Sequence, residues 1–130
     1  MDFIQPAGWK RPSGYSNGAV ASGKLLFVAG QIGWNPATCT FESDAFIKQF
    51  ELALANVVTV VRTAGGQPAD IARLTVYVTD KKNYLADLPA VGAAYRTHLG
   101  KHFPAMALVQ VSALVEDRAL VEIEATAVIP

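Results

Sequence analysis

The sequence has one cysteine, two histidines and no excess of either charge. A single cysteine, Cys39, excludes an internal disulfide, and its setting in "NPATCT" is typical of a surface turn, so we assign it no role. Lysine plus arginine and aspartate plus glutamate number 11 each, which leaves no net field to attract phosphates or an anionic membrane surface. We therefore expect neither nucleic acid nor a membrane as a partner.

Long apolar runs are also missing. The start, "MDFIQPAGWKRPSGYSNG", lacks the basic flank and apolar stretch of a signal peptide. No stretch approaches the ~20 apolar residues that a spanning helix needs. Hydrophobic residues still make up 52% of the 130 residues, which is enough for one core. We expect a single cytoplasmic domain over residues 1–130.

Metal and phosphate sites find little support. His98 and His102 are four residues apart, a spacing that suits a metal only on one continuous helix, and Gly100 between them argues against that. The "AGG" at 64–66 ends a predicted helix and does not open one, so it is no phosphate-binding loop. We expect no metal and no cofactor.

The first half of the chain alternates between strand and helix patterns. The apolar runs "GAVAS" and "KLLFVAGQIGW" are separated by Ser22-Gly23, which predicts a hairpin. The next segment has apolar residues at helical spacing, with Ser43 or Asp44 expected to cap its start and Gly65-Gly66 to end it. The alternation in "LTVYV" then predicts a central strand covered by that helix.

The second half repeats this order. A second helix is expected from near Leu88, where Pro89 is tolerated in the first turn, to Gly100. The runs "AMALVQVSALV" and "ALVEIEATAVI" flank the polar turn at 116–118 and predict a second hairpin. The order is β-β-α-β-α-β-β, an α+β class in which both helices cover one face of the sheet. One stripe of the second helical segment is apolar and aromatic: Tyr84, Leu88, Val91, Tyr95 and Leu99.

The other face of the sheet is predicted to remain open. In "LVEIEATAV", Glu122, Glu124 and Thr126 fall on one side of a strand, and the apolar residues between them fall on the other. Small and apolar residues also occur in the preceding run, at Ala105, Ala107, Val109 and Val111. Because large apolar patches seldom stay exposed, this composition favours burial against a second copy of the protein.

Several motifs, in order and spacing, resemble the RidA/YjgF family over nearly the whole chain. They are "GYSNG", "FVAGQIGWNP", "ALANVVTVVRTAGG", "LTVYVTD", "FPAM" and "VEIEATAV". The resemblance implies a chorismate-mutase-like fold of the bacillus type, with one mixed sheet and two helices on one face. It also implies a homotrimer with its sheets packed as a barrel, and a cleft at each subunit interface. The activity it implies is hydrolysis of reactive enamines and imines to a keto acid and ammonia.

One position departs from the family in a way that bears on substrate choice. A 2-imino acid needs its carboxylate held by a cation and a water oriented toward its imine carbon. In the family, an arginine in a "PAR" motif holds the carboxylate, but this sequence reads Pro104-Ala105-Met106. Loss of such a charged pair costs about 2–5 kcal/mol of binding. A family cysteine also falls on Leu108 and an asparagine on Gly92, so the resemblance implies a more apolar cleft.

Four family positions are retained: Tyr15, Gly30, Gln31 and Glu122. The resemblance implies that Tyr15 and Glu122 are catalytic and position a water, and that the backbone at Gly30 and Gln31 binds a polar edge of the ligand. From the residues alone, a different interpretation is open. Glu122 is then a carboxylate on the wet face, Gly30 a strand bend and Tyr15 an interface aromatic.

Other residues are candidates for the substrate site. Arg11, next to Lys10 and shortly before Tyr15, could replace the missing cation, and Arg96 and Arg118 are the remaining choices, although most surface arginines are simply solvated. Trp34, together with Trp9, could wall a ring-bearing ligand, or both could be buried at subunit contacts.

Three functions remain open. The first is an enamine or imine deaminase with altered specificity, acting on a small-molecule metabolite. The second is a homotrimer that binds a metabolite without turning it over. The third, an endoribonuclease or translation-inhibitor activity, has the least support, because the charge is balanced and no acid–base histidine pair stands beside a cation.

Overall fold

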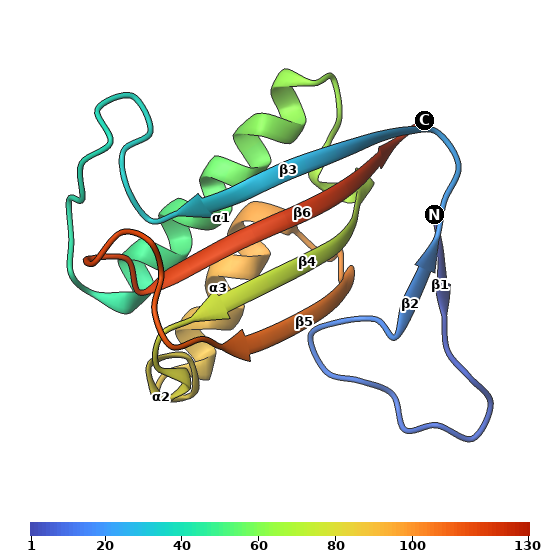
Figure 1. Cartoon of the computed structure of the whole chain (residues 1–130). Coiled ribbons are helices and arrows are strands. Elements are labelled where there is room, and N and C mark those ends of the chain that lie inside the picture. Colours follow the sequence, from blue (N-terminus) through green and yellow to red (C-terminus); the bar gives the residue numbers. More distant parts are fainter.

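A four-stranded sheet with helices on one of its faces forms the body of the molecule (Figure 1). The computed structural model describes all 130 residues. The strand order is β3-β6-β4-β5; β5 runs parallel to β4, and the other neighbours are antiparallel. The predicted α+β class and mixed sheet are therefore confirmed. The strands are β3 (Lys24–Ile32), β4 (Ile71–Val78), β5 (Ala105–Gln110) and β6 (Val121–Ile129).

Two long helices, α1 (Phe46–Thr63) and α3 (Leu88–Leu99), both lie behind the sheet in Figure 1 and leave its other face open, as predicted. None of the helices combines the length and apolarity that crossing a membrane requires. The smaller elements are β1 (Asp2–Ile4), β2 (Gly18–Val20), the 3₁₀ turn η1 (Pro68–Asp70) and α2 (Lys81–Leu85). β1 and β2 form a separate two-stranded sheet to one side.

The core lies between α1, α3 and the covered face of the sheet. From α1, Phe50, Leu54, Val57 and Val61 are completely buried, because they repeat at the three- and four-residue spacing of one helical face. In β6, the alternate positions from Val121 onward are buried, and the intervening positions are half-buried. The predicted division of β6 into an apolar and a polar side is confirmed.

The helix ends follow the sequence signals with one exception. Gly65 has φ +90°, and the amide of Gly66 donates to the Val61 carbonyl at 2.9 Å, so the glycine pair ends α1 as predicted. α3 runs from Leu88 to Leu99, also as predicted. The cap predicted for the start of α1 is wrong, because Ala45 is the N-cap and no side chain caps it.

The first predicted hairpin is wrong. β2 pairs with β1, and β3 pairs with β6 near the end of the chain. Gly23 lies between β2 and β3, where the chain passes from one sheet to the other. Its φ is +151°, and a Cβ there would collide with the backbone of Ile129. The glycine therefore allows β3 to run closely beside β6 and does not fold β3 back onto the preceding strand.

The second predicted hairpin is also wrong, since β4 lies between β5 and β6. The connection over residues 111–120 passes the end of β4 and is held there at both sides. The amide of Val111 donates to the Val78 carbonyl at 2.9 Å, and the amide of Thr79 donates to the Leu120 carbonyl at 3.2 Å. The polar residues 116–118 lie inside this crossing connection, so they mark a turn but not a hairpin.

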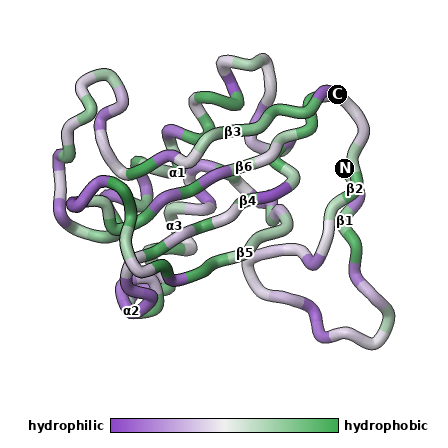
Figure 2. The backbone as a smooth tube through the Cα atoms, in the orientation of Figure 1, coloured by the Kyte–Doolittle hydropathy of each residue, from purple (hydrophilic) through white to green (hydrophobic).

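β5 is an edge strand, because β4 is its only neighbour in the sheet. Figure 2 shows that it is mainly hydrophobic along its length. Its register with β4 places Met106 beside Leu74 and Leu108 beside Val76. Leu74 and Val76 are fully buried. Met106 and Leu108 therefore face the helices, and the residues between them face the open side.

Candidate functional site

A cleft of about 620 Å³ lies between β5, α3 and the N-terminal loop. We call it the β5 cleft. Met106 and Leu108 form its floor, and Ser13, Gly14 and Tyr15 of the loop form one wall. The opposite wall comes from α2 and α3: Tyr84, Leu88, Val91, Gly92 and Tyr95. Seven of these ten lining residues are hydrophobic, so the cleft suits a ligand with a substantial apolar part.

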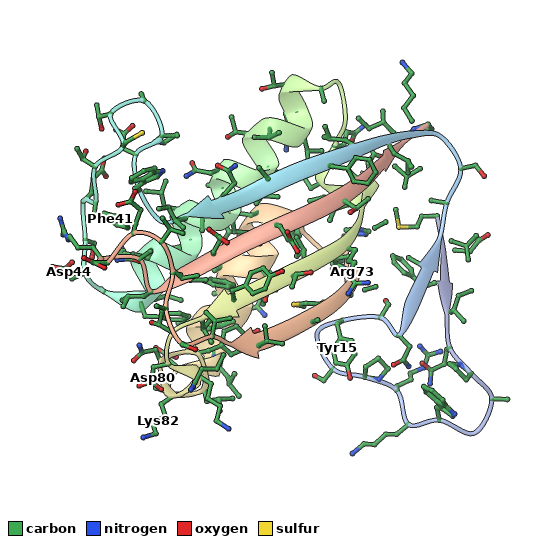
Figure 3. The ribbon with its side chains drawn as sticks, in the orientation of Figure 1. Tyr15, Phe41, Asp44, Arg73, Asp80 and Lys82 are labelled. Atoms are coloured by element: carbon green, nitrogen blue, oxygen red, sulfur yellow. The ribbon has the colours of Figure 1, made fainter.

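Hydrogen bonds of Ser16 hold the neighbouring Tyr15 at the mouth of the β5 cleft. The amide of Ser16 donates to the Pro104 carbonyl at 3.1 Å, and its hydroxyl donates to the Phe103 carbonyl at 2.5 Å. Ser16 also forms an isolated parallel bridge with Ala105, the first residue of β5. Figure 3 accordingly shows Tyr15 beside the start of β5, although 90 positions separate it from Ala105 in the sequence.

Inside the cleft, two tyrosine hydroxyls lead to the sulfur of Met106. The Tyr95 hydroxyl donates to Met106 Sδ at 3.2 Å and lies 3.1 Å from the Tyr84 hydroxyl. Since each phenol has one proton, Tyr84 then donates to the Tyr95 oxygen. Burial raises the pKa of both tyrosines, and the nearby Tyr84 raises the pKa of Tyr95 further. The interior of the cleft is therefore uncharged around neutral pH.

A second group of predicted residues lies on the open face of the sheet. We call Gly30 and Glu122 the Glu122 cluster; Gln31, the next residue of β3, pairs with Ile123, and its side-chain amide donates to the Ala29 carbonyl at 3.1 Å. The pairing of β3 with β6 shifts register between Val28 and Gln31, and this irregularity brings Gly30 against the Glu122 side chain. A Cβ on Gly30 would stand 2.7 Å from the Glu122 carboxyl carbon, so only glycine leaves room for the carboxylate in this position.

The same face holds a second carboxylate with a fixed partner. The hydroxyl of Tyr77 donates to Glu124 Oε1 at 2.7 Å, and this hydrogen bond is the main cause that raises the pKa of Tyr77. No side-chain hydrogen bond or ion pair engages Glu122 within the chain. Of the two carboxylates, Glu122 is therefore the one available to a ligand or a water.

Within one chain, the predicted site divides into two separate parts. Tyr15, Met106 and Leu108 lie in the β5 cleft, together with Gly92. The Glu122 cluster lies on the other side of the sheet, because Glu122 alternates with buried residues of β6 and points away from the helices. A single copy therefore does not bring all of the predicted residues together.

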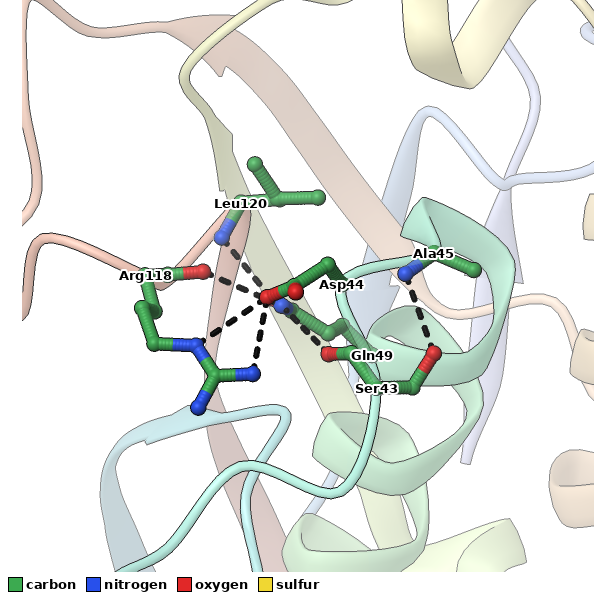
Figure 4. A network of polar contacts seen from close by, with 6 residues as sticks. All are labelled: Ser43, Asp44, Ala45, Gln49, Arg118 and Leu120. Carbon is green, nitrogen blue, oxygen red and sulfur yellow. Dashed lines mark hydrogen bonds and ion pairs between the residues drawn. The ribbon is translucent and has the colours of Figure 1, made fainter.

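Trp34 and Arg118 lie in a third region, away from both parts. Trp34 packs against Phe41, with the ring centroids 5.6 Å apart, and the Arg118 guanidinium lies 5.3 Å from the Phe41 ring centroid. Arg118 also forms an ion pair with Asp44 at 2.9 Å (Figure 4). Figure 3 shows Phe41 and Asp44 at the opposite end of the molecule from Tyr15.

Arg11 lines a separate cavity of about 570 Å³ that also includes Ser13, Gly14 and Tyr15. It is therefore next to the β5 cleft but does not line it. Trp9 has 64% of its surface exposed and lines neither cavity. His102 Nε2 is 2.6 Å from the Ile71 carbonyl oxygen, and no three histidine, cysteine or acidic side chains come together to hold a metal.

Sequence reasoning assigns no function to Tyr84 and Tyr95 of the β5 cleft. Tyr84 and Tyr95 were expected only as members of an apolar helical stripe. The available signal was the presence of two hydroxyls in that stripe, since a buried tyrosine hydroxyl usually has a hydrogen-bond partner. That signal predicts a polar contact but does not identify the sulfur of Met106 as the acceptor.

Comparison with known proteins supports one family for the whole chain. The family model for Endoribonuclease L-PSP matches residues 9–129. A RutC family protein of Synechocystis is 35% identical and covers 100% of this chain and 98% of that protein. The 2-iminobutanoate/2-iminopropanoate deaminase of Capra hircus is 31% identical, over 85% of this chain and 77% of that protein.

Solved structures agree with this result. YyfB of Yersinia pestis, from the conserved Rid protein family, has a TM-score of 0.85 and 34% identity, and the match covers 98% of both chains. TdcF of E. coli, whose crystal structure contains bound serine, has a TM-score of 0.69 and 32% identity over 100% of both chains. The chain belongs to the RidA/YjgF family, which is also described as the Endoribonuclease L-PSP or RutC family.

Proposed function

We propose that the protein is an enamine or imine deaminase whose complete site forms where the β5 cleft of one copy meets the Glu122 cluster of another, in a homotrimer. The observation that carries this proposal is the placement of an unpaired Glu122 carboxylate over Gly30, on a sheet face that no helix covers. A family relative named as a 2-iminobutanoate/2-iminopropanoate deaminase supports the reaction class. Bound serine in TdcF supports a small-molecule ligand.

The open face favours assembly with further copies. Phe27 has 73% and Leu25 has 62% of its surface exposed there, on β3. Apolar side chains of this size, close together on a sheet, favour burial in an interface. The proposal requires that a second copy packed against this face bring its own β5 cleft to the Glu122 cluster.

The reaction requires one general base and one oriented water. Glu122 removes a proton from the water as the oxygen attacks the imine carbon, and the carbon–nitrogen double bond becomes a single bond. The proton then passes to the nitrogen and gives a carbinolamine. Glu122 next takes the proton of the new hydroxyl group and passes it to the amino nitrogen, so the carbon–nitrogen bond breaks as the carbonyl forms, and the keto product and ammonia leave. The Tyr15 hydroxyl contributes a hydrogen bond that orients the water or the imine nitrogen.

Met106 changes which imines the site accepts. A thioether that accepts a hydrogen bond from Tyr95 provides no charge for a substrate carboxylate. The surrounding side chains are apolar or neutral, so the β5 cleft stabilises bulky apolar groups better than it stabilises small anions. We therefore assign to this protein imines that are larger or more apolar than 2-iminopropanoate.

A direct hydrolysis assay tests this function. An amino-acid oxidase generates 2-iminopropanoate or the imine of phenylalanine in situ, and loss of imine is followed against the uncatalysed rate. We expect wild type to accelerate the bulkier imine and Glu122→Ala to lose about 10²-fold or more of the activity. Glu124→Ala is the matched control, because it removes a carboxylate from the same face that is already bonded to Tyr77.

The alternative functions have distinct outcomes in the same experiment. If wild type leaves both imines at the uncatalysed rate but binds the corresponding 2-oxo acids, the protein is a metabolite-binding trimer and the enzymatic proposal is wrong. Degradation of a structured RNA by wild type, lost in Glu122→Ala, would instead favour the endoribonuclease activity after which the family model is named.

A further inference from the structure

Gly92 occupies an unfavourable position for its residue type. It lies in the middle of α3, where glycine loses more conformational freedom on folding than alanine and destabilises the helix. Its φ is ordinary, so no backbone strain requires glycine there. Gly92 does line the β5 cleft, and the absence of its side chain leaves space at the rim. The group that occupies this space therefore indicates whether the missing side chain at position 92 has a function.

The guanidinium of Arg96 fills that space. A Cβ on Gly92 would stand 3.3 Å from Arg96 Nη1, and apart from the two adjacent residues and the nearby backbone of α3 nothing else lies within 4 Å of it. Leu88, Gly92 and Arg96 follow each other at four-residue spacing, so they form one row along α3, and the first two line the cleft. The side chain of Arg96 runs back along this row toward the mouth of the cleft.

Arg96 is also without a partner in the chain. The ion pair of the structure joins Arg118 and Asp44, and no side-chain hydrogen bond engages Arg96. Arg73 is on the open face beside Tyr77, and Arg11 lines the neighbouring cavity. Arg96 is therefore the arginine that stands at the rim of the β5 cleft with all of its donors free.

We propose that Arg96 is the anion-binding residue of the β5 cleft and holds the carboxylate of a 2-imino or 2-oxo acid whose bulky apolar side chain enters the cleft. The proposal rests on the proposed function, because it names the substrate class of the same site. A planar guanidinium binds a carboxylate with two parallel hydrogen bonds, so one exposed arginine can both attract and orient the ligand.

In the family, the arginine that holds the substrate carboxylate falls at the position of Met106 on β5. In this protein, the substrate carboxylate would instead be held by Arg96 on α3. With Met106 on β5, the floor of the cleft is apolar, and the cation stands on α3 at the opening. A ligand bound by Arg96 places its carboxylate near solvent and its side chain against Met106 and Val91. A ligand with a methyl side chain would reach Arg96 but leave the interior empty, so we expect a preference for large apolar groups.

Calorimetric titration with phenylpyruvate and with its methyl ester tests the assignment, because the ester keeps the ring and lacks the charge. We expect wild type to bind phenylpyruvate at least about tenfold more tightly than the ester. Arg96→Gln should weaken phenylpyruvate binding by about tenfold or more and leave ester binding within about twofold. Arg62→Gln is the matched control: Arg62 is an exposed arginine in the last turn of α1, and its removal should change neither affinity.

Gly92→Ala provides a second variant that does not remove the charge. The added methyl displaces the guanidinium by a few tenths of an ångström, while alanine favours the helix, so phenylpyruvate binding should weaken with no loss of thermal stability. Equal binding of phenylpyruvate by wild type and Arg96→Gln would overturn the proposal, as would equal affinity of wild type for the acid and the ester.

The titration separates this proposal from the enzymatic one. If phenylpyruvate binds through Arg96 but no imine is hydrolysed, the proposed anion-binding role of Arg96 is supported and the proposed deaminase activity is wrong. If imines are hydrolysed in a Glu122-dependent reaction and Arg96→Gln retains wild-type affinity and KM, the deaminase stands and the anion site is wrong.

Discussion

The carboxyl group of Glu122 lies against Gly30 so closely that a Cβ at position 30 would stand 2.7 Å from its carboxyl carbon and 2.9 Å from one carboxylate oxygen. The conflict involves only the flexible end of the glutamate side chain. A larger residue at position 30 is therefore compatible with the fold, but it would displace the Glu122 carboxylate.

The first prediction uses this difference. Gly30→Ala should lower imine hydrolysis by about tenfold or more, because even a 1 Å displacement of a catalytic group weakens its alignment. Its unfolding free energy should change by less than about 1.5 kcal/mol, since the side chain of Glu122 can rotate away. Kinetics and urea denaturation measure the two effects. In a Glu122→Ala background, Gly30→Ala should have no further effect on the rate, and a large further loss would contradict the assignment.

The second prediction concerns the floor of the β5 cleft. Met106→Arg should raise kcat/KM for 2-iminopropanoate by about thirtyfold, which corresponds to about 2 kcal/mol for a new charged pair with the carboxylate. Met106→Leu is the control, because it keeps an apolar side chain of similar volume and should leave the small substrate unaffected. An unchanged kcat/KM in Met106→Arg would show that Met106 does not determine specificity.

The third prediction is a pH dependence of stability. Burial raises the pKa of Tyr95 above its ordinary value of 10.0. Above pH 10 the unfolded chain releases this proton while the folded chain retains it, so the unfolding free energy falls as the pH rises. One such group contributes a slope of at most about 1.4 kcal/mol per pH unit.

Tyr95→Phe removes this group and should reduce the slope between pH 10 and 11.5, measured by urea denaturation at several pH values. Burial also raises the pKa of Tyr84, so part of the slope in unfolding free energy should remain in Tyr95→Phe. Below pH 9 the two proteins should show parallel pH profiles. An identical slope above pH 10 in wild type and Tyr95→Phe would contradict the burial of this hydroxyl.

The fourth prediction concerns the polar network at the start of α1 (Figure 4). Gln49 has 1% of its surface exposed; its amide nitrogen donates to the carbonyls of Ser43 and Arg118 at 3.0 Å, and its oxygen accepts from the Leu120 amide at 2.8 Å. Gln49→Leu should lower the unfolding free energy by about 2–4 kcal/mol, because it leaves these backbone groups without partners.

Arg118→Ala is the control for this network, because it removes the exposed ion pair with Asp44 but keeps the carbonyl that Gln49 uses. Its destabilisation should be about 1 kcal/mol or less. Equal losses in chemical denaturation for the two variants would show that the exposed pair, and not Gln49, joins the start of α1 to the connection before β6.

The fifth prediction concerns assembly. Phe27→Glu introduces a charge on the open face where an aromatic ring is 73% exposed, and it should shift the protein from trimer to monomer in sedimentation velocity. Val115→Glu is the control, because Val115 is 98% exposed in the connection between β5 and β6, and it should remain trimeric. A monomeric wild type would contradict the proposal that the site forms between the β5 cleft of one copy and the Glu122 cluster of another.

Local signals in the sequence located the two long helices, apart from the N-cap of α1, but they missed the short helix α2 and did not give the strand pairing. The period of apolar residues and the pair Gly65-Gly66 located α1, and Pro89 with Gly100 located α3. Both predicted hairpins were wrong, because the partners of β3 and β5 are distant in the sequence and depend on the packing of the whole sheet. The two-residue signal at Ser22-Gly23 marks a turn, but the turn leads β3 to the end of β6.

The candidate site was predictable only in part for a similar reason. The resemblance indicated Tyr15, Gly30, Met106 and Glu122 as residues of one cleft, and the structure adds that Glu122 and Gly30 lie on the opposite side of the sheet from Met106 and Tyr15. Proximity in sequence favoured Arg11 as a substitute cation. The resemblance indicated that position 92 lies at the cleft, but the approach of the Arg96 guanidinium to Gly92 is seen only in the structure.

The contacts of Ser16 have a consequence for the behaviour of the sheet in solution. β5 is an apolar edge strand, and exposed edges of this kind recruit further strands and lead to aggregation. The parallel bridge between Ser16 and Ala105 occupies the beginning of that edge, with the loop that carries Tyr15 lying across it. The segment that lines the β5 cleft thus also covers the beginning of this edge, so we expect a mutation that loosens it to lower colloidal stability and to change the shape of the cleft together.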